Sequence, residues 1–278
     1  LVFREFIMKE KLERRFLAKL EKVNHISENQ HYIGYSKLYN RKIFIKVFND
    51  ENKFILENEI LKDESFLYIT SDYINKILVL SFREYKNLVS SDMENDVLIK
   101  ISKVISNFHK NKYIDKGKYK ETSLKKILEY NLTRLVKREE FDLLSRIYNE
   151  FFKLLCSIEG EYKESLVTIH GDFCLRNIKV YNKNIVLIDF ERAKYASYYL
   201  DFIKFFYNDL NNSKEKKDIF LNEYYRESNK KKISKNLEYC LIFISSMGIL
   251  NYTMRIKDRE FEKLGLTMLT DVKDFLQI

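Results

Sequence analysis

The chain has 278 residues, of which 33% are charged, and its formal net charge is +9 at pH 7. This length predicts one large core or two smaller ones. The three cysteines are widely spaced and lack metal-ligand spacing, which argues against a disulfide framework and predicts a reducing, cytoplasmic setting. The longest nearly apolar stretch, residues 240–250, is too short to cross a bilayer. The basic balance would suit nucleic-acid binding, but no motif of that class is present.

The first ten residues carry both acidic and basic side chains, which argues against a signal peptide. The first residue is Leu, and Met8 is a candidate natural start. We therefore attach no function to residues 1–7.

Residues 1–80 are predicted to form a small lobe with a five-stranded antiparallel sheet. Residues 53–62 have the apolar pattern of a helix, which carries Glu57 and Glu59. Lys46 lies among apolar residues of a predicted strand, an unfavourable place for a charge without a partner, although solvent-facing strand lysines are common. Alternating β-branched and aromatic residues predict strands at 21–26, 32–39, 43–48, 66–73 and 76–80.

Residues 89–278 are predicted to form a larger, mostly helical lobe, which follows a hinge at residues 81–88. Apolar residues recur at helical spacing over 97–108. Residues 124–159 read as two long amphipathic helices, and residues 197–278 are almost wholly helical in pattern.

A loop and a hairpin interrupt these helices. Residues 170–177 read His-Gly-Asp-Phe-Cys-Leu-Arg-Asn, and they lead into an alternating strand, a turn at 182–184 and a second strand at 185–188. This hairpin is expected to return Asp189 to the loop that contains Asn177.

The acidic and amide residues of this segment suit phosphoryl transfer. Asp172 would accept the proton of a substrate hydroxyl, and five residues later Asn177 would bind magnesium together with Asp189. Magnesium prefers hard oxygen ligands and commonly takes one or two carboxylates plus substrate phosphates.

The motif His-Gly-Asp-x-x-x-x-Asn, followed by Asp-Phe-Glu at 189–191, resembles the aminoglycoside phosphotransferase and choline kinase group, which are small-molecule relatives of the protein kinases. The resemblance implies an α+β, two-lobed, protein-kinase-like fold. Residues 1–80 would be the nucleotide-binding lobe, and residues 89–278 would hold the catalytic and substrate-binding residues. ATP or GTP would be the phosphoryl donor, and Mg²⁺ the metal.

Further residues are assigned by this resemblance. In the family, a strand lysine contacts the α- and β-phosphates and is held by a glutamate of the next helix, which assigns Lys46 to the nucleotide. Aligning Glu-Asn-Glu at 57–59 with the family's Glu-x-Glu favours Glu59 as the partner, with Glu57 as the alternative. Asp201 is interpreted as the structural aspartate that braces the catalytic loop, or else as an ordinary residue at a helix start.

We therefore expect an ATP-dependent small-molecule kinase whose acceptor is a hydroxyl-bearing sugar, amino alcohol or antibiotic. The alternative is a pseudokinase-like or nucleotide-regulated binding protein without turnover. The absence of a Gly-x-Gly-x-x-Gly loop favours that alternative. The turn expected over the phosphates is residues 27–31, where Glu28 would repel phosphate.

Charge constrains the acceptor. Kinases of polycationic aminoglycosides need acidic pockets, so a basic substrate lobe favours a neutral or anionic acceptor. These lysines could equally form a solvated helix face. A choline-type acceptor would need an aromatic cage, for which the chain has 20 tyrosines. The clustered lysines are Lys214, Lys216, Lys217, Lys230, Lys231, Lys232 and Lys235.

Overall fold

The computed structural model describes residues 2–24, 28–65, 67–114 and 122–278. The chain divides into two compact units, and a short return of the chain belongs to the first of them. The first unit is Leu1–Lys86 with Asp189–Ala193, and the second is Asn87–Ile188 with Lys194–Ile278. The predicted two-lobed α+β fold is confirmed. The assignment of nucleotide binding to one lobe and substrate binding to the other stays a prediction.

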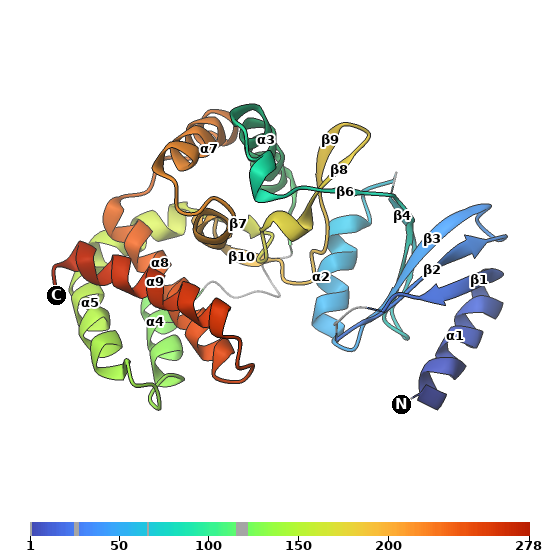
Figure 1. The fold of residues 1–278 in the computed structure, drawn as a ribbon, viewed down its shortest axis with the longest axis horizontal. Helices are drawn as coiled ribbons and strands as arrows, with labels where there is room; N and C mark the ends of the chain where they lie inside the picture. Colours follow the sequence, from blue (N-terminus) through green and yellow to red (C-terminus); the bar gives the residue numbers. More distant parts are fainter. Residues whose placement is uncertain (1, 25–27, 66, 115–121) are drawn as a thin grey trace. The chain divides into compact units, whose positions relative to one another are not determined.

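The first unit is built on the predicted five-stranded antiparallel sheet (Figure 1). Its strand order is β1-β2-β3-β5-β4. The first strand begins earlier than expected because the preceding helix stops at Leu17, which has a φ of 45°. The strands are β1 (Ala18–Lys22), β2 (Gln30–Ser36), β3 (Arg41–Val47), β4 (Tyr68–Asp72) and β5 (Ile77–Ser81).

Two helices accompany this sheet, α1 (Val2–Phe16) and α2 (Glu51–Leu61). Alternate residues of β3 point to opposite faces. Ile43, Ile45 and Val47 pack with Leu12 and Phe16 of α1 in the buried cluster on one face. Lys46 therefore points to the other face, toward α2. The sequence had not predicted α1.

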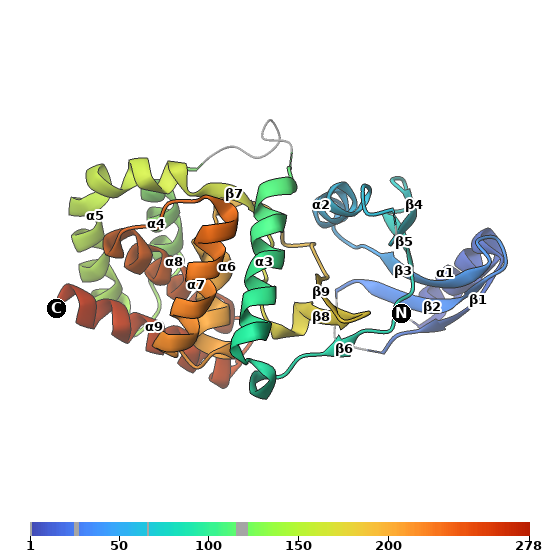
Figure 2. The same cartoon turned by 90° about the horizontal axis from the view of Figure 1, so that it is seen from above.

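The second unit is mostly helical, as expected (Figure 2). Serine or aspartate side chains cap α4, α7, α8 and α9 by accepting a backbone N–H of the first turn. The α-helices are α3 (Asn95–Asn111), α4 (Leu124–Thr133), α5 (Phe141–Glu164), α6 (Tyr199–Lys204), α7 (Lys214–Ser228), α8 (Lys235–Thr253) and α9 (Arg259–Leu276).

Short elements lie between these helices. A π-helix, η3 (Phe205–Asp209), follows α6 directly, and the 3-10 turns are η1 (Ser90–Asp92) and η2 (Leu175–Asn177). Strand β6 (Lys86–Asn87) lies where the chain passes from the first unit to the second. Strand β7 (Leu166–Ile169) pairs with β10 (Lys194–Ser197) in a two-stranded antiparallel sheet. Strand β8 (Ile178–Tyr181) pairs with β9 (Asn184–Leu187) in a three-stranded sheet of order β6-β8-β9.

An aromatic core supports the loop that follows β7. Phe202 of α6 lies 5.0 Å from Phe220 and 4.8 Å from Tyr224 of α7, measured between ring centroids. Phe173 of the loop is buried in the same group, 5.1 Å from Phe205. Such edge-to-face pairs add to the burial of apolar area, so the loop is anchored from beneath.

Among the described residues, no helix has both the length and the apolar character needed to span a membrane.

Ile45→Ala should destabilise the first unit by about 2–5 kcal/mol, because it opens a cavity in a core position that is 0% exposed. Ile74→Ala is the matched control, since Ile74 is 92% exposed and its loss should change stability by about 0.5 kcal/mol or less. Urea denaturation of both variants measures the difference. Equal effects would show that Ile45 does not pack in this core.

Candidate active site

The loop after β7 turns sharply at Gly171, which has a φ of 77°. Glycine adopts this left-handed conformation without the penalty that a Cβ brings. The turn separates His170, which is fully buried, from Asp172, which is 4% exposed. A glycine at this position therefore lets the polar side chains on either side of it both be buried.

Asp201 of α6 holds this turn by its carboxylate. Oδ1 accepts the backbone N–H of Gly171 at 2.8 Å, and Oδ2 accepts that of His170 at 2.7 Å. His109 of α3 lies 3.0 Å from Oδ2 through Nε2. Burial would raise the pKa of Asp201, but its hydrogen bonds and the nearby histidines outweigh burial and hold the pKa below its usual value. The predicted bracing role of Asp201 is confirmed.

The carboxylate of Asp172 lies between two cations. Lys204 Nζ donates to Oδ1 at 3.0 Å, and Arg176 Nη2 donates to Oδ2 at 2.5 Å. Burial opposes ionisation of Asp172, but Lys204 and Arg176 outweigh it and hold the pKa well below its ordinary range. Asp172 is therefore an ionised, oriented carboxylate and a weak base in the ground state.

Asn177 belongs to the same buried cluster. Its Nδ2 donates to the backbone carbonyl of Asp172 at 2.9 Å and lies 3.3 Å from Oδ2. The structure thus brings together the two residues that the sequence paired five positions apart. An Nδ2 that donates inward leaves the amide oxygen of Asn177 as the available metal ligand.

The predicted hairpin is confirmed. Strands β8 and β9 pair from Ile178 with Leu187 to Tyr181 with Asn184. Asn182 and Lys183 form the turn with φ values of 48° and 66°, as a two-residue type I′ hairpin requires. Ile188 then donates its N–H to the carbonyl of Asn177 at 3.0 Å. The next residue along the chain is Asp189, with a φ of 67°.

In the first unit, Lys46 is 3% exposed and faces three carboxylates. Its Nζ lies 2.7 Å from Glu57, 2.7 Å from Asp189 and 3.2 Å from Glu191. Burial alone would lower the pKa of Lys46, but the three carboxylates outweigh it and raise the pKa above its usual value. The expectation of a buried, partnered strand lysine is therefore confirmed.

The assignment of Glu59 as the helix partner of Lys46 is wrong, because Glu57 makes this ion pair. Residues two apart on a helix point to different faces. Glu57 follows Phe54 by three residues and precedes Leu61 by four, so it lies on their buried stripe, whereas Glu59 is only partly buried. Counting the helical phase from these apolar residues would have identified Glu57.

The carboxylates around Lys46 suit a divalent cation. Oxygens of Glu57, Asp189 and Glu191 lie within 4.8 Å of one another. Burial and the neighbouring carboxylates raise the pKa of Glu57 to about 7, although Lys46 opposes this. Three clustered carboxylates exceed the charge of one ammonium, and hard oxygen donors are what magnesium binds. The sequence had noted Glu191 only as part of the Asp-Phe-Glu motif.

The turn expected over the phosphates is described from Glu28 onward, and Ser27 lies outside the described residues. Lys53 pairs with Glu28 at 2.6 Å, and this hydrogen bond lowers the pKa of Glu28. Asn29 donates to Glu191 at 2.6 Å and accepts the N–H of Asn49 at 3.2 Å. The negative charge of Glu28, which was expected to repel phosphate, is thus paired with a lysine.

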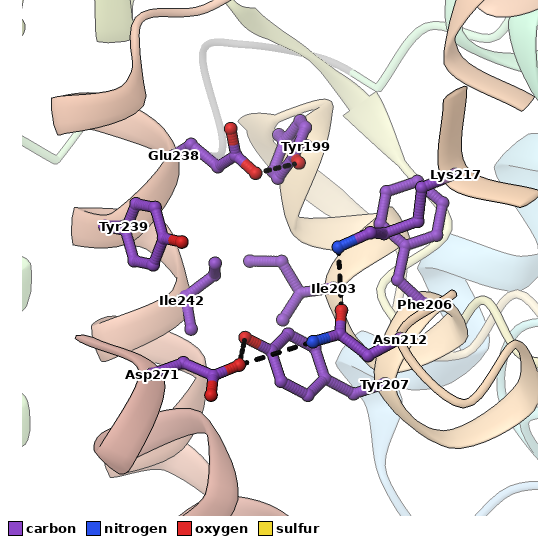
Figure 3. Close-up of a pocket in the computed structure, with 10 residues that line it drawn as sticks. All are labelled: Tyr199, Ile203, Phe206, Tyr207, Asn212, Lys217, Glu238, Tyr239, Ile242 and Asp271. Carbon is purple, nitrogen blue, oxygen red and sulfur yellow. Dashed lines mark hydrogen bonds between the residues drawn. The ribbon is translucent and has the colours of Figure 1, made fainter. Parts of the chain in front are cut away.

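A small cavity lies elsewhere in the second unit, between α6, η3, α7, α8 and α9 (Figure 3). Tyr199 donates to Glu238 at 2.8 Å, and Tyr207 donates to Asp271 at 2.6 Å. Lys217 also lines the cavity, so its walls carry both signs of charge. Its volume is about 40 Å³. A cavity needs roughly 10–15 Å³ on this measure to hold a water molecule, so this one has room for a few waters at most.

Comparison with known proteins bears on this geometry. Residues 111–229 match the model of the APH family, described as a phosphotransferase enzyme family. The match contains the loop, the hairpin, α6 and α7. The resemblance inferred from the sequence is confirmed, and so is the enzyme class that it implies, a phosphotransferase. A search of curated proteins finds no match.

Solved structures share the fold at low sequence identity. The choline kinase LicA from Streptococcus pneumoniae is 17% identical over 97% of this chain and 99% of its own, with a TM-score of 0.68. The ethanolamine kinase from Plasmodium vivax is 19% identical over 92% and 82%, with a TM-score of 0.61. Spectinomycin phosphotransferase APH(9)-Ia, solved with ADP and spectinomycin, is 12% identical over 96% and 97%, with a TM-score of 0.63.

Glu57→Ala should lower the free energy of unfolding by about 2 kcal/mol, because it removes a buried partner of Lys46 while Asp189 and Glu191 remain. Glu59→Ala should lower it by about 1 kcal/mol or less, as expected for a partly exposed helix residue. Chemical denaturation of both variants gives the ranking. The opposite ranking would restore the assignment of Glu59.

Proposed function

We propose that this chain transfers the γ-phosphoryl group of ATP, or of GTP, to a hydroxyl of a small molecule with magnesium. The observation that carries the proposal is the state of Asp172: buried, ionised, and five residues before an asparagine that donates to it. This matches what a positioned base in a phosphoryl-transfer loop requires. The family match over residues 111–229 supports the same reaction class.

Asp172 would bind the acceptor hydroxyl and orient its oxygen toward the γ-phosphorus. Phosphoryl transfer passes through a loose transition state, so the hydroxyl proton leaves late and a weak base is sufficient. The low pKa of Asp172 is therefore compatible with its role. Asp172 would take the proton as the new oxygen–phosphorus bond forms.

Lys46 would contact the α- and β-phosphates, and Glu57 would keep its ammonium in place. Asn177 and Asp189 are the proposed ligands of magnesium, which would neutralise charge on the phosphates when bound. Lys46 is held by carboxylates, so its ammonium needs little reorientation for an anionic ligand. Solved structures of this fold with ADP and with AMP support nucleotide binding.

The acceptor is proposed to be a neutral or anionic alcohol such as a sugar. The structurally similar proteins are named as kinases of choline, ethanolamine and spectinomycin, so the fold is used with several acceptors. In this chain, Arg176 and Lys204 place two positive charges beside Asp172. A cationic group close to the accepting hydroxyl would be repelled there.

A pseudokinase-like binding protein is the second candidate. It is favoured by the lack of a glycine-rich loop and by the fact that both carboxylate oxygens of Asp172 already contact cations. The two functions differ in turnover, which the first of the following predictions measures.

Asp172→Asn should lower turnover about a hundredfold or more, because it removes the basic oxygen while keeping size and much of the hydrogen bonding. Binding of Mg-ATP should change little, since Asp172 is assigned to the acceptor. The exposed Asp218→Asn is the control and should be fully active. Near-normal turnover in Asp172→Asn would exclude Asp172 as the base.

Mg²⁺ and ATP together should raise the melting temperature of the wild type, because a ligand that binds the native state stabilises it by mass action. Asp189→Ala should lose the magnesium-dependent part of this increase and remain folded by circular dichroism. If the variant responds to Mg-ATP as strongly as the wild type, Asp189 is not a metal ligand.

A panel of sugars, amino alcohols, nucleosides and aminoglycosides, scored by ADP release, should identify the acceptor class. We expect turnover with a neutral or anionic alcohol and poor turnover with aminoglycosides, because their ammonium groups meet Arg176 and Lys204. Efficient phosphorylation of kanamycin-like compounds would contradict the charge argument.

A further inference from the structure

The segment formed by α6 and η3 holds the catalytic loop at three points. Asp201 accepts the N–H groups of His170 and Gly171. Lys204 donates to Asp172, and Asp209 accepts the N–H of Leu175 at 3.0 Å. The motif of the loop predicted none of the contacts made by Lys204 and Asp209. The same segment, Tyr199–Asp209, thus fixes the loop before, at and after Asp172.

The π-helix makes this arrangement possible. Leu210 N–H bonds to the carbonyl of Phe205 at 3.1 Å, the i to i+5 pattern that defines a π turn. Residues five apart on a regular α-helix are separated by about 140° around the axis. The wider turn instead brings Asp209 toward the side on which Lys204 lies. Short π segments are rare and occur frequently at functional sites.

The two cations on Asp172 differ in how they are held. The Lys204 side chain is 28% exposed. In the sequence Lys204 lies between Asp201 and Asp209, which both accept hydrogen bonds from the loop. The Arg176 side chain is 68% exposed and belongs to the loop itself. An incoming acceptor would therefore displace Arg176 from Oδ2 more easily than Lys204 from Oδ1.

We propose that Lys204 is a positioning residue for phosphoryl transfer: it holds Oδ1 of Asp172, so that Oδ2, the oxygen that Arg176 contacts, faces the acceptor hydroxyl. This inference rests on the proposed function, in which Asp172 is the base.

The experiment compares Lys204→Met, which keeps length but removes charge, with Lys204→Arg, which restores a cation. Lys103→Met is the matched control, because Lys103 also forms an ion pair, with Glu223 at an N–O distance of 3.5 Å, but not with this loop. In Lys204→Met, kcat should fall roughly tenfold to a hundredfold with the KM for ATP unchanged. Lys204→Arg should recover kcat in part, and Lys103→Met should match the wild type.

Wild-type kcat in Lys204→Met, or a loss of kcat that Lys204→Arg does not restore in part, would overturn the role of Lys204. If Lys204→Met is fully active while Asp172→Asn is inactive, the inference fails and the proposed function stands. If Asp172→Asn remains active, the proposed function fails, because Asp172 is then not the base.

Discussion

The loop at residues 170–177, which carries the proposed base, depends on one buried carboxylate. Asp201 is 3% exposed and accepts two successive backbone N–H groups, those of His170 and Gly171, while it also contacts His109. A buried anion is costly unless every lone pair has a donor, so this group is stable only when the loop has the conformation seen here. That conformation places Asp172 next to Lys204 and Asn177. The orientation of the proposed base is therefore set by hydrogen bonds that it does not make itself.

Each unit has a cluster of charged side chains, and the two clusters have opposite proportions of cations and carboxylates. In the second unit a single carboxylate, Asp172, lies between two cations, which keep it ionised. In the first unit a single ammonium, that of Lys46, lies among three carboxylates. The first arrangement suits a base that takes a proton late, and the second retains excess negative charge that a divalent cation can compensate. Both charge clusters therefore fit the proposed phosphoryl transfer.

Sequence patterns predicted correctly the features that depend on neighbouring residues within one strand or turn. The alternation in β8 and β9 and the Asn182-Lys183 turn predicted the hairpin before Asp189, and an apolar strand predicted that Lys46 needs a partner. The pattern could not choose between Glu57 and Glu59, because both fit the Glu-x-Glu triplet and the choice depends on the helix face that each one occupies. Only Glu57 lies on the buried stripe with Phe54 and Leu61. The contacts of Lys204 and Asp209 follow from a π turn, which leaves no periodic signal in the sequence.

The central claim is that a phosphoryl group moves from ATP to a hydroxyl with Asp172 as the base. Phosphorus NMR of the wild type with Mg-ATP and a pooled set of alcohols tests it most directly. The account predicts that ADP and a new phosphomonoester appear in equal amounts, and that Asp172→Asn forms neither at a comparable rate. Release of inorganic phosphate alone, at the same rate in both proteins, would contradict it.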